Sequence, residues 1–273
     1  MTAIQPIGRN VRANGIRSHV LHYVGPGAPL VLVPGITSPA VTWDFVAGRL
    51  AELFDTFVVD VRGRGLSSSG PDLDYSLDAM ADDLSALIAA LKVENVTVLG
   101  HSMGARIAIR AAVRNSTGMG RLILVDPPVS GPGRRPYPAK LSWYVDSIRL
   151  ALEGMDAEAM RVFCPTWSED QLRLRAEWLH TCFESAIVAA FEGFHTDDIH
   201  KDLPQLAVPV ALMVAGRGGV IEPADELEIA SLNPAIRTAR VPNAGHMIPW
   251  DDFDGFFQAL DTLLGTSFER TAA

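Results

Sequence analysis

The chain has 273 residues and a formal net charge of −9 at pH 7. Hydrophobic residues make up 48% of it and charged residues 20%, which is typical of a globular protein with enough apolar side chains for a sizeable core. The length fits one large domain or two small ones. The negative charge disfavours nucleic acid or an anionic membrane as the main partner, because both are themselves negatively charged.

The two cysteines, Cys164 and Cys182, lack metal-site spacing and are too few for a disulfide scaffold. We interpret them as free thiols in a reducing cytosol. The first residues contain no apolar signal core, and no stretch is as long as a membrane-spanning helix. These features predict a cytoplasmic protein that does not bind membranes, and they leave its oligomeric state open.

Short apolar runs alternate with helical patterns over the first 126 residues. Two strands within residues 11–23 are expected to form a hairpin at Asn14-Gly15, because Asn-Gly is a strong hairpin signal. The later predictions are strands at 29–33, 56–60, 96–99 and 122–126, and helices at 41–53, 76–91 and from Ser102 to about 115.

The alternation stops at residue 127 and resumes near residue 207. Between these points the pattern predicts helices without clear strands, which indicates a helical cap over residues 127–206. Residues 1–126 and 207–273 are then the core, with later strands at 208–214 and 236–241 and helices from Pro223 and over 249–264. Strands alternating with helices predict an α/β fold with a mostly parallel sheet flanked by helices on both faces.

A Gly-x-Ser-x-Gly motif lies between an apolar run and a helical pattern. Gly100 and Gly104 allow the strand and the helix to approach each other closely around Ser102. The serine hydroxyl is then exposed at the N-terminus of a helix, where the N–H group of Met103 can stabilise an oxyanion. The motif in this context predicts a nucleophilic serine.

A nucleophilic serine needs a base, and His246 is the best-placed histidine because it lies in a loop after the last predicted strand. His101 adjoins the serine but is expected to point away from it. The acid that orients the base usually follows the penultimate strand, yet the loop at residues 216–219 contains none. Asp126 is favoured, since it ends the strand after the Ser102 unit, and Glu222 is the alternative. Proline follows Asp126, which predicts an extended backbone there.

The second oxyanion donor is expected in the loop after the strand at residues 29–33. Pro34-Gly35 stands where a His-Gly pair is common, and Gly35 still permits the turn. The N–H group of Ile36 is therefore the candidate donor.

These motifs resemble the α/β-hydrolase family along essentially the whole chain. The matching segments are Pro34-Gly35 and residues 60–65, 100–104 and 243–246. The resemblance implies an eight-stranded, mostly parallel sheet.

A narrower resemblance is to the N-formylmaleamate deformylases of aerobic nicotinate degradation, over residues 125–135, 176–182, 213–222 and 246–252. This resemblance implies hydrolysis of a linear amide C–N bond, giving maleamate and formate through a formyl-serine intermediate. It also implies that Asp126 is the acid and that no metal or organic cofactor is needed.

Such a substrate carries a carboxylate, so the cap should offer a cation or hydrogen-bond donors. The candidate side chains for the carboxylate are Arg134, Arg135, Arg173, Arg175 and His180. The candidate walls of the substrate site are Trp143, Tyr144 and Trp167. The sequence does not rank them.

Two other readings stay open at this point. A carboxylesterase, an enol-lactonase or a carbon–carbon bond hydrolase would use the same residues, because a fold does not fix a substrate. A ligand-binding protein on a degenerate hydrolase scaffold is the other alternative, although the presence of both Ser102 and His246 argues against it.

Overall fold

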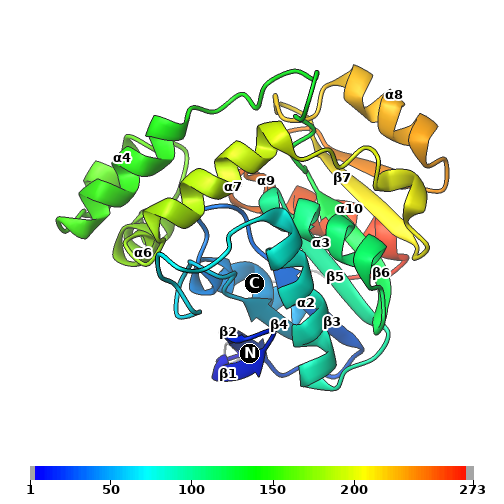
Figure 1. Ribbon diagram of the computed structural model, residues 1–273, viewed down its shortest axis with the longest axis horizontal. Helices are drawn as coiled ribbons and strands as arrows, with labels where there is room; N and C mark the ends of the chain where they lie inside the picture. The colour runs from blue at the N-terminus through cyan, green and yellow to red at the C-terminus, as the bar shows by residue number, and fades with distance from the viewer. Residues whose placement is uncertain (1–3, 269–273) are drawn as a thin grey trace.

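Within residues 4–268, which the computed structural model describes, eight strands form a single sheet (Figure 1). The strands are β1 (Ile7–Ala13), β2 (Ile16–Tyr23), β3 (Pro29–Val33), β4 (Asp55–Val59), β5 (Val96–His101), β6 (Met119–Val125), β7 (Val210–Ala215) and β8 (Arg237–Val241). Their order is β1-β2-β4-β3-β5-β6-β7-β8. Strand β2 is antiparallel to both of its neighbours, and all other pairs are parallel. The expected mostly parallel, eight-stranded α/β fold is confirmed.

Helices cover both faces of this sheet. The helices outside the segment between β6 and β7 are η1 (Ala40–Trp43), α1 (Asp44–Leu50), α2 (Leu77–Leu91), α3 (Met103–Arg114), α8 (Pro223–Leu232), α9 (Ile248–Asp251) and α10 (Phe253–Leu264). Figure 1 shows α2 and α3 in front of the sheet and α10 behind it. Helix α3 packs on β5 and β6, and α10 packs on β7 and β8. Every residue of β5 and of β7 is buried, as expected for strands covered on both faces.

Three predicted helices show where the chain starts or divides a helix. Helix α2 begins after Ser76, whose hydroxyl accepts a hydrogen bond from the N–H of Ala79 at 3.2 Å. The helix predicted over 249–264 is divided into α9 and α10. Asp252 leaves helical geometry there, and its carboxylate accepts a hydrogen bond from the N–H of Gly255 at the start of α10. The helix predicted over 41–53 is likewise a 3₁₀ turn, η1, followed by the shorter α1.

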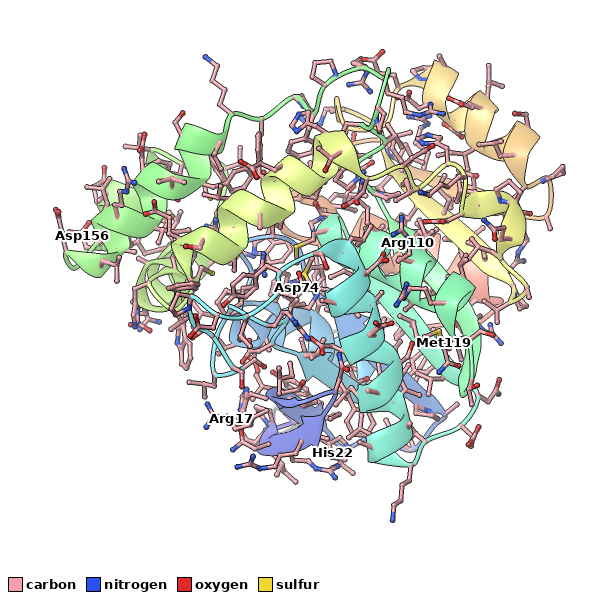
Figure 2. The ribbon with its side chains drawn as sticks, in the orientation of Figure 1. Arg17, His22, Asp74, Arg110, Met119 and Asp156 are labelled. Atoms are coloured by element: carbon pink, nitrogen blue, oxygen red, sulfur yellow. The ribbon has the colours of Figure 1, made fainter. Side chains whose placement is uncertain are left out.

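Four α-helices and one short 3₁₀ helix lie between β6 and β7. The α-helices are α4 (Leu141–Leu152), α5 (Ala157–Arg161), α6 (Glu169–Leu179) and α7 (Glu184–Thr196), and the 3₁₀ helix is η2 (Leu203–Gln205). Figure 1 shows α4, α6 and α7 together at one end of the molecule. In Figure 2 Asp156, the N-cap residue of α5, lies at the tip of this group, and Arg17 of β2 lies at the lower edge of the molecule. The division of the chain into a core and a cap over residues 127–206 stays a prediction.

Both cysteines are buried and free. Burial raises the pKa of the Cys182 thiol to about 12, so that the thiol is neutral at physiological pH.

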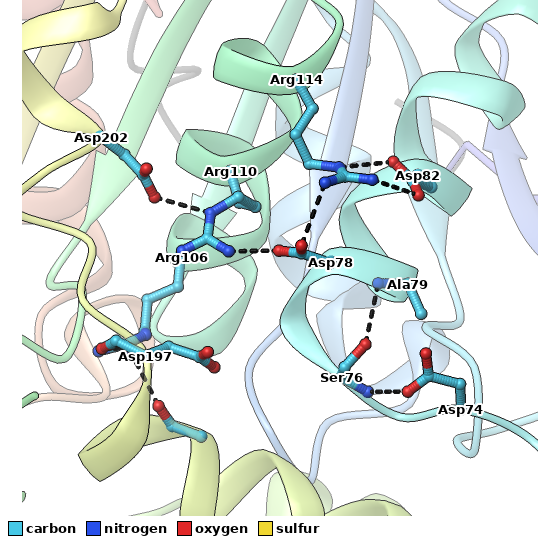
Figure 3. Close-up of polar contacts among 11 residues, drawn as sticks. Asp74, Ser76, Asp78, Ala79, Asp82, Arg106, Arg110, Arg114, Asp197 and Asp202 are labelled. Atoms are coloured by element: carbon cyan, nitrogen blue, oxygen red, sulfur yellow. Dashed lines mark hydrogen bonds and ion pairs between the residues drawn. The ribbon is translucent and has the colours of Figure 1, made fainter.

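An arginine of α3 joins the core to the segment that leaves the four helices (Figure 3). Arg110 is largely buried and pairs with Asp202, just before η2, at an Nε–Oδ2 distance of 2.7 Å. It also pairs with Asp78 of α2. Arg114, one turn further along α3, forms exposed pairs with Asp78 and Asp82.

We expect Arg110→Met to lower the free energy of unfolding by about 3 kcal/mol, because it leaves the buried carboxylate of Asp202 without its cation. The matched variant Arg114→Met removes only exposed ion pairs and should cost less than about 1 kcal/mol. Urea unfolding followed by circular dichroism measures both changes. Equal midpoints for the two variants would contradict this account of the Arg110 pair.

Candidate active site

The turn between β5 and α3 places Ser102 in a backbone conformation that side chains rarely adopt, with φ at 54°. Its two flanking glycines leave no room for side chains. A Cβ on Gly100 would lie 2.4 Å from the carbonyl oxygen of Gly104, and a Cβ on Gly104 would lie 1.9 Å from that of Val33. The strand, the turn and the helix are therefore packed backbone against backbone, as the motif predicts.

Ser102, His246 and Asp126 form a chain of hydrogen bonds. The serine Oγ lies 2.9 Å from His246 Nε2, and His246 Nδ1 lies 2.7 Å from Asp126 Oδ2. The Asp126 carboxylate is fully buried, whereas the His246 side chain is 22% exposed. With Nδ1–H donating to the carboxylate, Nε2 is free to accept the serine proton. The geometry is that of a base held in place by an acid.

The backbone of Asp126 differs from the prediction. Its φ is 45°, in the left-handed region, so the expected extended conformation is wrong. The following proline disfavours the right-handed helical region but does not impose an extended one. In this conformation Asp126 Oδ1 accepts a hydrogen bond from the N–H of Ala215 at 3.3 Å, while Oδ2 faces His246. Strand β7 thereby helps to orient the carboxylate.

The alternative acid lies elsewhere. Glu222 is the N-cap residue of α8, and its carboxylate lies 3.5 Å from Nε of Arg135. The acid-free loop after β7 is nevertheless close to the site, because a Cβ on Gly218 would lie 3.8 Å from Asp126 Oδ2. The residues that follow β6 and β7 therefore lie side by side, next to the position that the Asp126 carboxylate occupies.

The two expected oxyanion donors flank the serine. Met103 is the first residue of α3, so its N–H group lacks a partner within the helix. The loop carrying Ile36 runs against the serine, since a Cβ on Gly35 would lie 3.5 Å from Ser102 Cβ. The role of both N–H groups in binding an oxyanion stays a prediction.

Two buried arginines hold the loop after β3. Arg64 Nε donates to the carbonyl oxygen of Ile36 at 2.9 Å. The two Nη atoms of Arg175 donate to the carbonyl oxygen and to Oγ1 of Thr37, each at 3.0 Å. These bonds fix the orientations of successive peptide groups, and hence the direction of the neighbouring N–H groups.

A cavity of about 780 Å³ opens over the serine. Ser102 and His246 line it, and so do the three predicted aromatic wall residues, Trp143, Tyr144 and Trp167. The cavity is thus bounded by the sheet edge on one side and by the helices between β6 and β7 on the other.

His180 was predicted at the substrate site, and this prediction is wrong. It is the exposed C-cap residue of α6 and is not among the residues that line the cavity. The buried face of α6 carries Leu172, Arg175 and Leu179, which recur at helical spacing. His180 lies just beyond that face and points to solvent.

Most of the candidate cations also lie outside the cavity. Arg134 pairs with a carboxylate of α8, Arg135 pairs with Asp225, and Arg173 forms an exposed pair within α6. Arg175 alone of the four predicted arginines lines the cavity.

Tyr137 was not predicted at the site. Its hydroxyl lies 3.5 Å from His246 Nε2 and 3.2 Å from the hydroxyl of Tyr144. Burial raises the pKa of Tyr137 well above its usual value, so the phenol is a neutral hydrogen-bond donor at physiological pH. Tyr137 lies in an irregular proline-rich segment, where the sequence carries no signal for it beyond the neighbouring Pro136 and Pro138.

His101 supports the loop of His246 from below. Its ring is buried, and Nε2 lies 2.9 Å from the carbonyl oxygen of His246. Burial, together with the nearby His246 ring, lowers the pKa of His101 to about 3. The neutral ring therefore donates through Nε2–H, away from Ser102, as the sequence predicts.

Among residues 4–268, no group of three or more His, Cys, Asp or Glu side chains is arranged to hold a metal ion. Over the same residues, no helix is both long and apolar enough to span a membrane.

Residues 28–253 match the family described as the alpha/beta hydrolase fold, and the chain belongs to that family. It is similar to the N-formylmaleamate deformylase of Pseudomonas putida, with 65% identity over 94% of this chain and 96% of the relative. A crystal structure of N-formylmaleamic acid deformylase from Pseudomonas putida superposes with a TM-score of 0.90 at 65% identity, covering 93% of this chain and all of that one. A more distant relative is the 2-(acetamidomethylene)succinate hydrolase of Mesorhizobium japonicum, with 26% identity over 82% of this chain and 83% of the relative.

The low pKa of His101 makes stability depend on pH. The ring takes up a proton near pH 6.5 in the unfolded chain but only near pH 3 in the folded one, so its contribution to stability is lost as the pH falls between these values. Gln can still donate to the carbonyl of His246 but has no proton to gain. Between pH 7 and pH 5, we expect the free energy of unfolding of His101→Gln to fall by about 2 kcal/mol less than that of the wild type. Urea unfolding of both proteins at the two pH values tests this. An equal fall in the free energy of unfolding for the wild type and the variant would contradict it.

Proposed function

We propose that the protein is a serine hydrolase that cleaves the formyl C–N bond of N-formylmaleamate and gives maleamate and formate. The observation that carries the proposal is the hydrogen-bonded chain of Ser102, His246 and Asp126, of which Ser102 and His246 line the cavity. The 65% identity to a deformylase that acts on this compound supports the choice of substrate. Residues 127–206 would act as the cap of the site, and the cytoplasmic location predicted from the sequence belongs to the same proposal.

In the first half of the reaction, Ser102 Oγ attacks the formyl carbon while His246 Nε2 takes its proton. The N–H groups of Ile36 and Met103 stabilise the negative charge that develops on the formyl oxygen. The C–N bond then breaks, and His246 returns the proton to the departing nitrogen. That nitrogen lies between two carbonyl groups, so it leaves more easily than a simple amine.

The second half of the reaction releases formate. A water molecule gives a proton to His246 and attacks the carbon of the formyl-serine ester. The ester bond breaks, the proton returns to Ser102 Oγ, and formate leaves the cavity. Asp126 stabilises the imidazolium form of His246 in both halves without taking up a proton itself.

The roles of the three residues are tested by formate release from N-formylmaleamate. We expect Ser102→Ala to abolish turnover, because it removes the nucleophile. Asp126→Asn should lower kcat about ten-thousand-fold, because the amide favours the wrong tautomer of His246. Glu222→Gln is the control and should stay within about twofold of the wild type, since Glu222 caps α8. A larger loss in Glu222→Gln than in Asp126→Asn would reverse the assignment of the acid.

The proposal also gives a role to Tyr137. Its neutral hydroxyl lies near His246 Nε2, where the leaving nitrogen must collect its proton. Tyr137 would donate a hydrogen bond to this nitrogen as negative charge develops on it.

We expect Tyr137→Phe to lower kcat for N-formylmaleamate about tenfold and to change KM little, because the lost bond forms in the transition state. Turnover of p-nitrophenyl formate should change less, since its leaving group needs no such help. Tyr144→Phe is the matched control, because it removes the neighbouring hydroxyl that contacts Tyr137 and leaves the hydroxyl of Tyr137 in place. A loss confined to KM, or equal losses on both substrates, would contradict this role.

A further inference from the structure

Arg175 is a buried cation in the wall of the cavity. Its side chain comes from the inner face of α6 and is only 3% exposed. Its two hydrogen bonds to oxygen go to uncharged atoms of Thr37, its other polar neighbour is the neutral thiol of Cys164, and its buried Nε has no hydrogen-bond partner. None of the ion pairs formed within residues 4–268 includes Arg175. The charge is therefore buried without a counter-ion.

Aromatic rings enclose this cation. The guanidinium carbon lies 5.9 Å from the ring centroid of Trp143 and 5.5 Å from that of Trp167. Both rings line the same cavity. They stabilise the cation and hold its plane, but they also remove it from bulk water. A buried charge without a partner costs substantial free energy, so this arrangement is best explained by an anion that completes it when a ligand binds.

The other charged groups that line the cavity are not buried cations without a counter-ion. Lys140 and Asp146 line it, but both are exposed. Asp251 is half-buried, and its carboxylate accepts a hydrogen bond from the N–H of Gly245. Arg175 is therefore the buried cation that a bound anion meets in this wall.

The position of Arg175 also limits the size of the ligand. Arg175 is bonded to Thr37, which directly follows Ile36, the expected oxyanion donor. The anion site and the reacting carbonyl group thus share one short loop, so a small molecule can occupy both. The cis double bond of N-formylmaleamate turns its carboxylate back toward the amide, which suits two adjoining sites.

We propose that Arg175 binds the carboxylate of the substrate and makes the site selective for short acyl amides with an anionic end. This inference rests on the proposed function for the identity of the substrate. Arg175 has five N–H donors in a planar fork, of which its bonds to Thr37 use two. The carboxylate bonds to the remaining donors and supplies the missing negative charge.

Binding of the product tests the inference without turnover. Calorimetry with maleamate, and with uncharged maleamide as its neutral counterpart, is carried out on the wild type, Arg175→Gln and Arg173→Gln. Arg173 lies two positions away on α6, is exposed, and serves as the matched control. We expect Arg175→Gln to weaken maleamate binding at least thirtyfold, which corresponds to about 2 kcal/mol, and to leave maleamide binding unchanged. Arg173→Gln should bind both ligands as the wild type does.

Kinetics supply the second measurement. Arg175→Gln should lower kcat/KM for N-formylmaleamate at least thirtyfold more than it lowers kcat/KM for neutral p-nitrophenyl formate, because only the first substrate loses the partner of its carboxylate, whereas both depend on the loop that Arg175 holds. Arg175→Lys, which keeps the charge but not the fork, should recover part of the loss. Thermal unfolding verifies that the variants are folded. If Arg175→Gln is unfolded, Arg175→Lys is used for the test in its place.

The two proposals fail in different ways. If the wild type and Arg175→Gln release formate equally well, the role of Arg175 is wrong and the proposed function stands. If the wild type releases no formate but binds maleamate through Arg175, the substrate is wrong and the anion site stands. Equal affinity of the wild type for maleamate and maleamide, or a parallel loss of both in Arg175→Gln, overturns the role of Arg175.

Discussion

The left-handed backbone of Ser102, confined between two glycines, is the constraint on which the rest of the site depends. Because Gly104 lies directly against the end of β3, the serine cannot shift without moving the centre of the sheet. Parallel strands end at the same edge, so the loops after β3, β6 and β8 all reach this turn. Each loop then supplies one group: the N–H of Ile36, the carboxylate of Asp126 and the imidazole of His246.

Features that depend on local chemistry could be predicted from the sequence. The hairpin at Asn14-Gly15 and the turn at Ser102 each follow from residues that favour one backbone conformation. The position of Asp126 beside His246 required one further step, which was to place its strand next to that of the serine. The parallel pairing of β5 with β6 shows that this step was correct.

Features that depend on packing between distant segments could not be predicted. Nothing in the sequence distinguishes Arg175 from its three companion arginines, since only the rotation of α6 against the core turns it inward. His180 fails as a prediction for the same reason. Tyr137 reaches His246 from an irregular segment whose path has no periodicity. The left-handed φ of Asp126 reflects its bonds to β7 and to the histidine, which are tertiary contacts.

The carboxylate from β6 has a consequence for the loop that follows β7. With Asp126 in place, residues 216–219 carry no part of the proton relay, although Gly219 and Val220 still line the cavity. Arg135 holds this stretch through the carbonyl oxygens of both residues. The chain thus separates the residues that perform the chemistry from a neighbouring wall that shapes the ligand. Selection for a new substrate can alter that wall while the reactive groups stay untouched.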